Sequence, residues 1–118
     1  MRSCIFCQIV KKEIPTDFIY QDEKIAAFKD IRPIAPVHIL IIPKEHIPTI
    51  DDLKDNQRDL AGGLIIVAKK IARDLKISSH GYKLLFRVKK HGGQEVDHLH
   101  LHLIGGAPLE EIIRPINR

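Results

Sequence analysis

The stretch VDHLHLHLIGG, residues 96–106, places histidine at every second position, as His98, His100 and His102, with leucines between them. A β-strand directs alternate side chains to opposite faces, so the pattern predicts a strand with leucines on one face and histidines on the other. Imidazole binds metal ions, transfers protons near neutral pH and attacks electrophiles. A half-exposed strand could carry one histidine by chance, but three of the seven histidines in strict register indicate a functional row.

The apolar patterns around this strand predict an α+β domain. Alternating or continuously apolar short runs are typical of strands, and five occur, at residues 18–22, 24–30, 37–43, 82–88 and 97–104. From about Asn56 to Leu75, apolar residues recur at spacings of three and four, which indicates one long helix. A short helical turn is expected at residues 8–15. This order favours an antiparallel sheet of about five strands over a doubly wound one.

The composition is that of an ordinary globular protein. The 118 residues are 44% hydrophobic and 29% charged, which suits one domain over residues 1–118. No apolar run approaches the ~20 residues that cross a membrane. The first residues lack a secretory signal pattern, so we expect a cytoplasmic protein. The net charge of +4 favours anionic ligands weakly, and neither a Walker loop nor a GxGxxG sequence occurs.

The two cysteines form a CxxC motif, Cys4 and Cys7. A structural disulfide is not expected in a cytoplasmic protein. A redox CxxC normally follows a strand and opens a helix, but only three residues precede Cys4. Two thiolates at this spacing can instead hold one zinc ion. The motif then supplies half of a metal site, and histidines are the obvious source of the other two ligands.

The sequence resembles the histidine-triad (HIT) family, whose signature His-φ-His-φ-His-φ-φ, with φ hydrophobic, is matched by residues 98–104. Two further blocks match at the family spacing, CIFCQIVKKEIP at 4–15 and AFKDIRPIAPVHILIIPKEHI at 27–47. The resemblance covers nearly the whole chain and is closest to the Hint branch, the histidine-triad nucleotide-binding proteins. It implies a single HIT-like domain with a short N-terminal helix, and a homodimer.

The resemblance also implies the chemistry, which is hydrolysis or transfer at the α-phosphorus of a nucleotide. His100, the central residue of the row, corresponds to the nucleophile that forms a nucleotidyl-histidine intermediate. His102 corresponds to the residue that steers phosphate and protons, and His38 to a fourth active-site histidine. The expected ligands are purine nucleotides such as AMP and nucleoside phosphoramidates, and the expected activity is that of a purine nucleoside phosphoramidase.

The same comparison assigns nucleotide-binding positions. Asp30 matches the acid that binds the ribose hydroxyls, and Gln94 a polar residue on the phosphate side. Arg87 departs from the family pattern, which has Asn there, and we expect it to point to the phosphate side, where phosphate or a nearby acid neutralises it. The alternative is that Arg87 points to solvent as one more surface cation. Asp97 and Ala107 are further departures. The remaining expected positions, whose apolar members would also suit an ordinary core, are Phe6, Ile9, Phe28, Ile31, Leu40, Gly93, Glu95 and Val96.

Some HIT relatives hold zinc with residues that correspond to Cys4, Cys7, His46 and His98. These four make a closed Cys₂His₂ shell, so the resemblance implies a structural Zn²⁺ and a chemistry that needs no metal. The alternative is two reduced, buried thiols with His46 exposed.

Two rival functions remain open at this point. His100 and His102 could bind a catalytic metal, because histidines at i and i+2 on a strand can do so. The chain could also be a zinc-stapled module that binds nucleic acid without catalysis, through its basic residues Lys83, Arg87, Lys89, Lys90 and His91. The scarcity of aromatic residues leaves little for base stacking, so we expect the nucleotide hydrolase.

Overall fold

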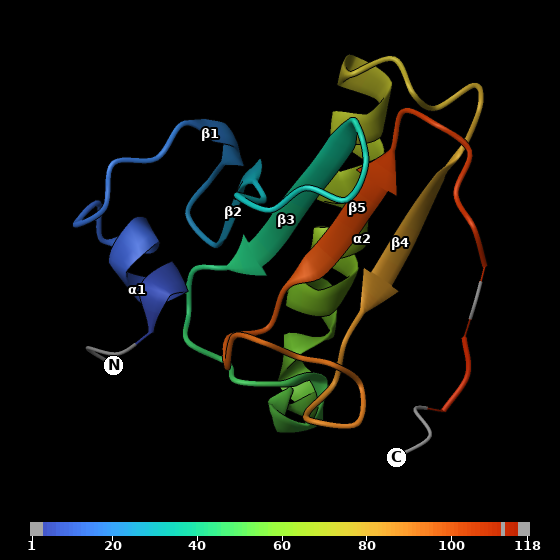
Figure 1. Ribbon diagram of the computed structural model, residues 1–118. Helices are drawn as coiled ribbons and strands as arrows, with labels where there is room; N and C mark the ends of the chain where they lie inside the picture. Colours follow the sequence, from blue (N-terminus) through green and yellow to red (C-terminus); the bar gives the residue numbers. More distant parts are fainter. Residues whose placement is uncertain (1–3, 112, 116–118) are drawn as a thin grey trace.

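The structure, a computed structural model that describes residues 4–111 and 113–115, is built on a five-stranded antiparallel sheet (Figure 1). Its order across the sheet is β1-β2-β3-β5-β4. The predicted α+β class and strand number are confirmed. The strand bounds are β1 Phe18–Gln21, β2 Ile25–Lys29, β3 Val37–Pro43, β4 Tyr82–Phe86 and β5 Leu101–Gly105.

The long helix α2, Arg58–Asp74, covers one face of the sheet. Two short 3₁₀ turns, Ile50–Asp52 and Asp55–Gln57, precede it. The helix lies within the predicted bounds 56–75, and its buried side follows the predicted spacing, except that Leu75, expected in the stripe, is the C-cap and is 41% exposed. Among the described residues, no helix is long and apolar enough to cross a membrane. The stripe buries Leu64, Val67, Ala68, Ile71 and Ala72 against the sheet.

The short helix α1, Ile5–Val10, contributes to a second apolar cluster on the other face of the sheet. The helical turn was predicted at residues 8–15, but the helix begins earlier, within the CxxC motif, and ends at Val10. Cys4 is the N-cap, and its Sγ accepts the backbone N–H of Cys7 at 3.2 Å. A thiol therefore takes the capping role that serine or aspartate usually has.

The sequence predicted a strand over the whole histidine row, but only part of the row lies on one. Strand β5 begins at Leu101, because the N–H of Leu99 donates to the carbonyl of Ile47 at 2.7 Å and not to a neighbouring strand. The alternation nevertheless persists through the irregular segment. Leu99, Leu101 and Leu103 pack in the core under α2. The histidines consequently lie on the opposite face, the one that α1 partly covers. The predicted strand 82–88 is also shorter and ends at Phe86.

Candidate active site and metal cluster

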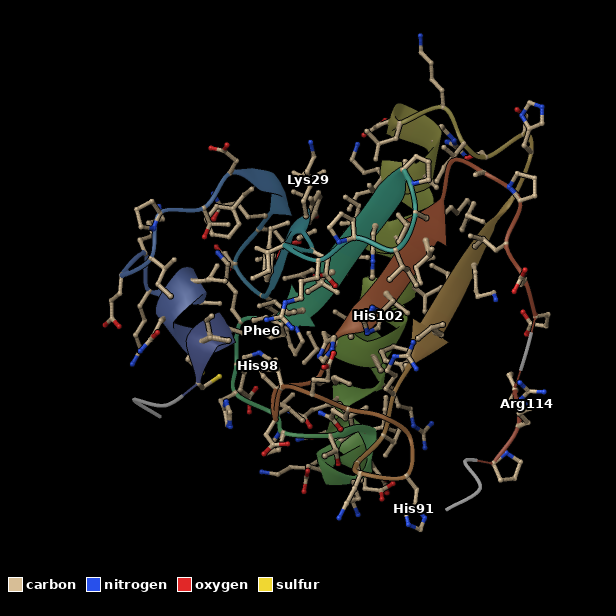
Figure 2. The ribbon with its side chains drawn as sticks, in the orientation of Figure 1. Phe6, Lys29, His91, His98, His102 and Arg114 are labelled. Atoms are coloured by element: carbon tan, nitrogen blue, oxygen red, sulfur yellow. The ribbon has the colours of Figure 1, made fainter. Side chains whose placement is uncertain are left out.

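Four histidines lie together on the face of the sheet that is turned away from α2. His38 comes from β3, His102 from β5, and His98 and His100 from the segment before β5. All four are buried, with exposed fractions between 0% and 7%. In the strand register His102 is opposite Leu40, which places His38 diagonally from His102, within side-chain reach. Figure 2 shows His98 near Phe6, between α1 and the sheet, with His102 farther along on β5.

His100 is held in one tautomer by its own chain. Its Nδ1 lies 2.7 Å from the carbonyl oxygen of His98. A carbonyl only accepts hydrogen bonds, so Nδ1 carries the proton and Nε2 keeps its lone pair. Burial lowers the pKa of His100 below its usual value. The ring is therefore neutral at pH 7 with a nucleophilic nitrogen available, as a covalent role would require.

A chain of hydrogen bonds sets the tautomers of the other two histidines. The backbone N–H of Ile34 donates to Nδ1 of His38 at 3.2 Å, so the ring proton of neutral His38 is on Nε2. That Nε2 lies 2.9 Å from Nδ1 of His102 and 3.3 Å from Oδ2 of Asp30. Donation to the nearer atom leaves the proton of His102 on Nε2. This buried Nε2 has no hydrogen-bond partner among the described residues, so a donor is left free beside His100.

The whole row is neutral at pH 7. Burial lowers the pKa of His98 and of His102 to about 4, and it lowers the pKa of His38. The positive charge of Arg87 adds to the lowering at His38 and His102. The uncharged imidazoles lie between two fixed charges, the carboxylate of Asp30, 3.3 Å from Nε2 of His38, and the guanidinium of Arg87.

An apolar wall stands beside the histidines. The ring of Phe6 meets His100 edge-on, with centroids 5.2 Å apart, and Phe28 lies 5.5 Å from Phe6. Ile9 and Leu40 complete the wall, and Val96 packs against it. Ile31 is not part of it, because its side chain is 87% exposed on the loop after β2. A flat apolar surface next to neutral imidazoles can receive an aromatic ring, although the same residues also form a core cluster.

Asp30 and Gln94 both make bonds within the protein. Asp30 accepts the N–H of Arg32 at 2.9 Å and lies beside His38, so it caps the loop after β2 as well as bordering the site. Gln94 donates its amide protons to the carbonyls of Pro48 and Val96, at 2.7 and 2.9 Å. Its role at a phosphate stays a prediction.

The loop between β4 and the histidine row requires its glycines. A Cβ on Gly92 would lie 2.4 Å from the carbonyl oxygen of Val88, and Gly93 has φ +80°. Glu95 is exposed on this loop.

Arg87 follows β4 directly. In the register Leu85 is opposite His102 and Phe86 is opposite Leu101, so the next residue continues toward His100 on the histidine face. Its side chain extends beside Gly93 and is exposed. Neither Glu95 nor Asp97 neutralises its charge, since no carboxylate of residues 4–111 and 113–115 lies within ion-pair distance of the guanidinium.

Cys4, Cys7, His46 and His98 form the second cluster. Their ligand atoms lie within 4.8 Å of one another. The Cys4 Sγ to His98 Nδ1 distance is 3.3 Å, and Cys7 Sγ lies 3.2 Å from His46 Nδ1 and 3.6 Å from His98 Nδ1. A tetrahedral ion with bonds of about 2.3 Å to sulfur and 2.0 Å to nitrogen has S···N edges of roughly 3.5 Å. The residues therefore fit a metal ion.

Supporting groups agree with that fit. Nε2 of His98 lies 2.8 Å from the carbonyl of Pro43 and donates to it, which leaves Nδ1 facing the thiols with a lone pair. Burial raises the pKa of Cys7 to about 11, and its hydrogen bond with Cys4 adds to the rise, so a thiolate there needs a cation. His46 is half-buried and lies against Cys7, which corrects the alternative in which it was exposed.

The rival readings find little support in the contacts. Within the described residues, no group of potential metal ligands includes His100. Asp30, His38 and His102 do lie close enough to share an ion, but an ion on Nε2 of His38 would put its Nδ1 proton against the N–H of Ile34. Of the basic residues suggested for nucleic acid, Lys83 pairs with Glu111 and Lys89 with Asp51, at 2.6 and 2.8 Å.

The backbone groups that orient the rings were not foreseen individually. The amide of Ile34 and the carbonyl of Pro43 are main-chain groups. Every residue type has such groups, so the sequence does not reveal which of them will contact a histidine. In the sequence, the pair of prolines in IRPIAP, residues 31–36, does indicate an ordered loop directly before His38.

Comparison with known proteins gives consistent results. A family model described as HIT domain matches residues 11–109. The chain is 50% identical over 105 residues to a purine nucleoside phosphoramidase from Escherichia coli (strain K12), covering 89% of this chain and 88% of that protein. The crystal structure of a HIT family hydrolase from Legionella pneumophila Philadelphia 1 matches with TM-score 0.89 and 49% identity, over 92% of this chain and 96% of the other. A histidine triad protein from Clostridium difficile matches with TM-score 0.91 and 36% identity, over 96% and 98%.

Proposed function

The chain belongs to the HIT domain family and is a HIT family hydrolase, and on that premise we propose that it cleaves purine nucleoside phosphoramidates at the α-phosphorus. The observation that carries the proposal is the tautomer of His100, whose Nδ1–H is bound to the carbonyl of His98 while Nε2 keeps its lone pair. The relative from Escherichia coli, a purine nucleoside phosphoramidase by name, supports the substrate class.

The proposed reaction has two displacements. Nε2 of His100 attacks the α-phosphorus, the P–N bond to the amine breaks, and the departing nitrogen takes up a proton from the medium. Water then attacks the phosphorus of the nucleotidyl-histidine and gives a proton to the medium, the P–N bond to His100 breaks, and the nucleoside monophosphate leaves with the oxygen of water. The lone pair returns to Nε2, so the enzyme is regenerated without a metal or other co-reactant.

The neighbouring groups have proposed roles in both steps. His102 donates its free Nε2–H to a phosphoryl oxygen, where charge grows in each transition state. His38 keeps His102 in the donating tautomer, and Asp30, beside His38, binds the ribose hydroxyls. The purine rests on the wall of Phe6, Ile9, Phe28 and Leu40, with Ile31 and Val96 at its border. Arg87, Gly93, Gln94 and Glu95 surround the phosphate side.

We also infer a structural zinc ion at Cys4, Cys7, His46 and His98. The distances, the burial and the lone pair of His98 support it. Bound there, zinc would tie α1 to the histidine segment and deprotonate the thiols. A Cys₂His₂ shell has no open position, so the ion takes no part in the displacement.

We further propose that the protein is a homodimer of single HIT domains and is located in the cytoplasm. Ile65 and Ile66 are 47% and 63% exposed on α2, an apolar surface that a second copy would cover. Free thiols at Cys4 and Cys7 suit a reducing compartment. Light scattering on a sizing column tests the dimer.

The decisive experiment is a mass spectrum of the protein after mixing with an adenosine 5′-phosphoramidate and rapid denaturation. An adenylyl adduct on the peptide that contains His100 is expected, and His100→Asn should abolish it. Turnover by the wild-type protein without any adduct, in single-turnover mixing, would contradict the covalent route.

A further inference from the structure

Arg87 lies on the β4 flank of the histidine cluster, on the other side from the apolar wall. Across the sheet, the apolar wall includes Phe28 of β2, the histidines lie on β3 and β5, and Arg87 follows β4. If the purine and ribose lie over β2 and β3, the group on the far side of the phosphorus is directed toward β4. That group is the remainder of the substrate, the amine that leaves.

The charge of Arg87 is not neutralised by an acid in the part of the chain that the structure describes. On the same strand and loop, Lys83 pairs with Glu111 and Lys89 with Asp51. Arg87 has no such partner among residues 4–111 and 113–115. Its Nη1 and Cδ would lie 3.6 and 3.8 Å from a Cβ on Gly93, so the absence of a side chain there leaves the guanidinium room along the loop.

The phosphoryl group itself already has a dedicated donor. The α-phosphoryl of a phosphoramidate carries a single negative charge, and Nε2–H of His102 is buried beside the nucleophile without a hydrogen-bond partner among the described residues. A planar guanidinium presents paired N–H groups whose geometry matches a carboxylate. The cation on the β4 flank is therefore matched by a second anion, carried by the leaving amine.

We propose that Arg87 makes this enzyme selective for nucleoside phosphoramidates whose amine bears a carboxylate, that is, conjugates of amino acids with a free carboxyl group. The inference rests on the proposed function and deepens it by naming the leaving group. Arg87 donates two hydrogen bonds to the carboxylate, and these bonds help to bind the substrate. The carboxylate leaves the site as part of the product amine.

Two matched substrates test the selectivity, adenosine 5′-phosphoryl-β-alanine and its β-alaninamide analogue, which differ only in the charge of the leaving group. The ratio of kcat/KM for the acid to that for the amide is the readout. In Arg87→Asn this ratio should fall roughly tenfold, between the effect of an exposed ion pair and that of a charged hydrogen bond. Arg87→Lys should give an intermediate ratio, because it keeps the charge and loses the paired geometry.

Lys90→Asn is the control, because it removes an exposed cation from the same loop with the same change in net charge. Its ratio should equal that of the wild-type protein. Binding of both conjugates to His100→Asn, with and without Arg87→Asn, measures the same preference as a Kd and without turnover. Melting curves of each variant verify folding.

The possible results separate the two proposals. If the wild-type protein cleaves neither conjugate, the proposed function fails and this inference falls with it. If the wild-type protein cleaves both but Arg87→Asn leaves the ratio unchanged, the function stands and the inference is overturned. If that unchanged ratio comes with equal losses for the acid and the amide, Arg87 acts on the α-phosphoryl group instead.

Discussion

The carbonyl oxygen of His98 lies 2.7 Å from Nδ1 of His100, while the imidazole of His98 lies 3.3 Å from the thiol of Cys4. One residue therefore belongs to both clusters, by its main chain to the candidate nucleophile and by its side chain to the candidate metal site. The position of His98 sets the ring orientation of His100. Stability of the metal cluster and readiness of the nucleophile are linked through it.

Loss of the metal cluster should cost more stability than activity. Cys4→Ser removes one ligand, and we expect the melting temperature to fall by about 10 °C or more, since structural zinc contributes several kcal/mol to folding. Turnover at moderate temperature should fall less, because the carbonyl of His98 stays in place while the chain is folded. Elemental analysis of reduced, freshly purified wild-type protein should give close to one zinc per chain. Protein that is stable and free of metal would refute the zinc proposal.

Removal of the nucleophile should abolish chemistry and spare binding. His100→Ala should lower kcat for a phosphoramidate by at least about 10³-fold, because it removes the nitrogen whose lone pair attacks phosphorus. The Kd for AMP, measured by calorimetry, should change little. A variant that keeps most of its turnover would show that His100 is not the nucleophile.

The free donor of His102 should matter in the transition state. His102→Ala removes the Nε2–H without disturbing the bond between His100 and His98, and we expect kcat to fall about 10²- to 10³-fold with a smaller change in KM. His80→Ala is the matched control, since His80 is exposed on the loop after α2. Equal rates for the two variants would exclude the proposed role.

Acid should destabilise the protein through His102. Burial lowers its pKa to about 4 in the folded protein, against an ordinary value near 6.5, so the unfolded chain binds the proton first. Its stabilising contribution is complete above pH 6.5 and is lost as the pH falls toward 4, by about 3 kcal/mol at most. Urea unfolding at pH 7 and pH 4.5 measures this, and His102→Gln should show a smaller loss. An identical loss in the variant would assign the effect to other groups.

Two glycines should respond to alanine in opposite directions. Gly62 lies within α2 with open space around it, so Gly62→Ala should stabilise the protein by about 0.5–1 kcal/mol. Gly92→Ala should destabilise it, because the new methyl group would meet backbone atoms of Val88. Chemical denaturation of both variants tests the pair. A stabilised Gly92→Ala would show that this loop does not approach as closely as the structure has it.

Much of the fold followed from local pattern. Alternation in HLHLHL divides leucines from histidines wherever the backbone is extended, which is why the division survives even though β5 begins only at Leu101. The apolar stripe from Leu60 to Leu75 identified α2 for the same reason, since a helix repeats its faces at a fixed angle. The residues of both clusters were likewise named in advance, through the resemblance of three sequence blocks to one family.

Tertiary structure alone decided how those residues are oriented. The N–H of Ile34, the carbonyl of Pro43 and the carbonyl of His98 determine which ring nitrogen of each histidine is free. These are main-chain atoms, present at every residue, and their directions depend on how loops are packed. Periodicity is a property of one segment, so it can be recognised from the residue types of that segment alone. The tautomer of a buried imidazole depends on which backbone group from elsewhere in the chain meets it, and only the folded chain determines that.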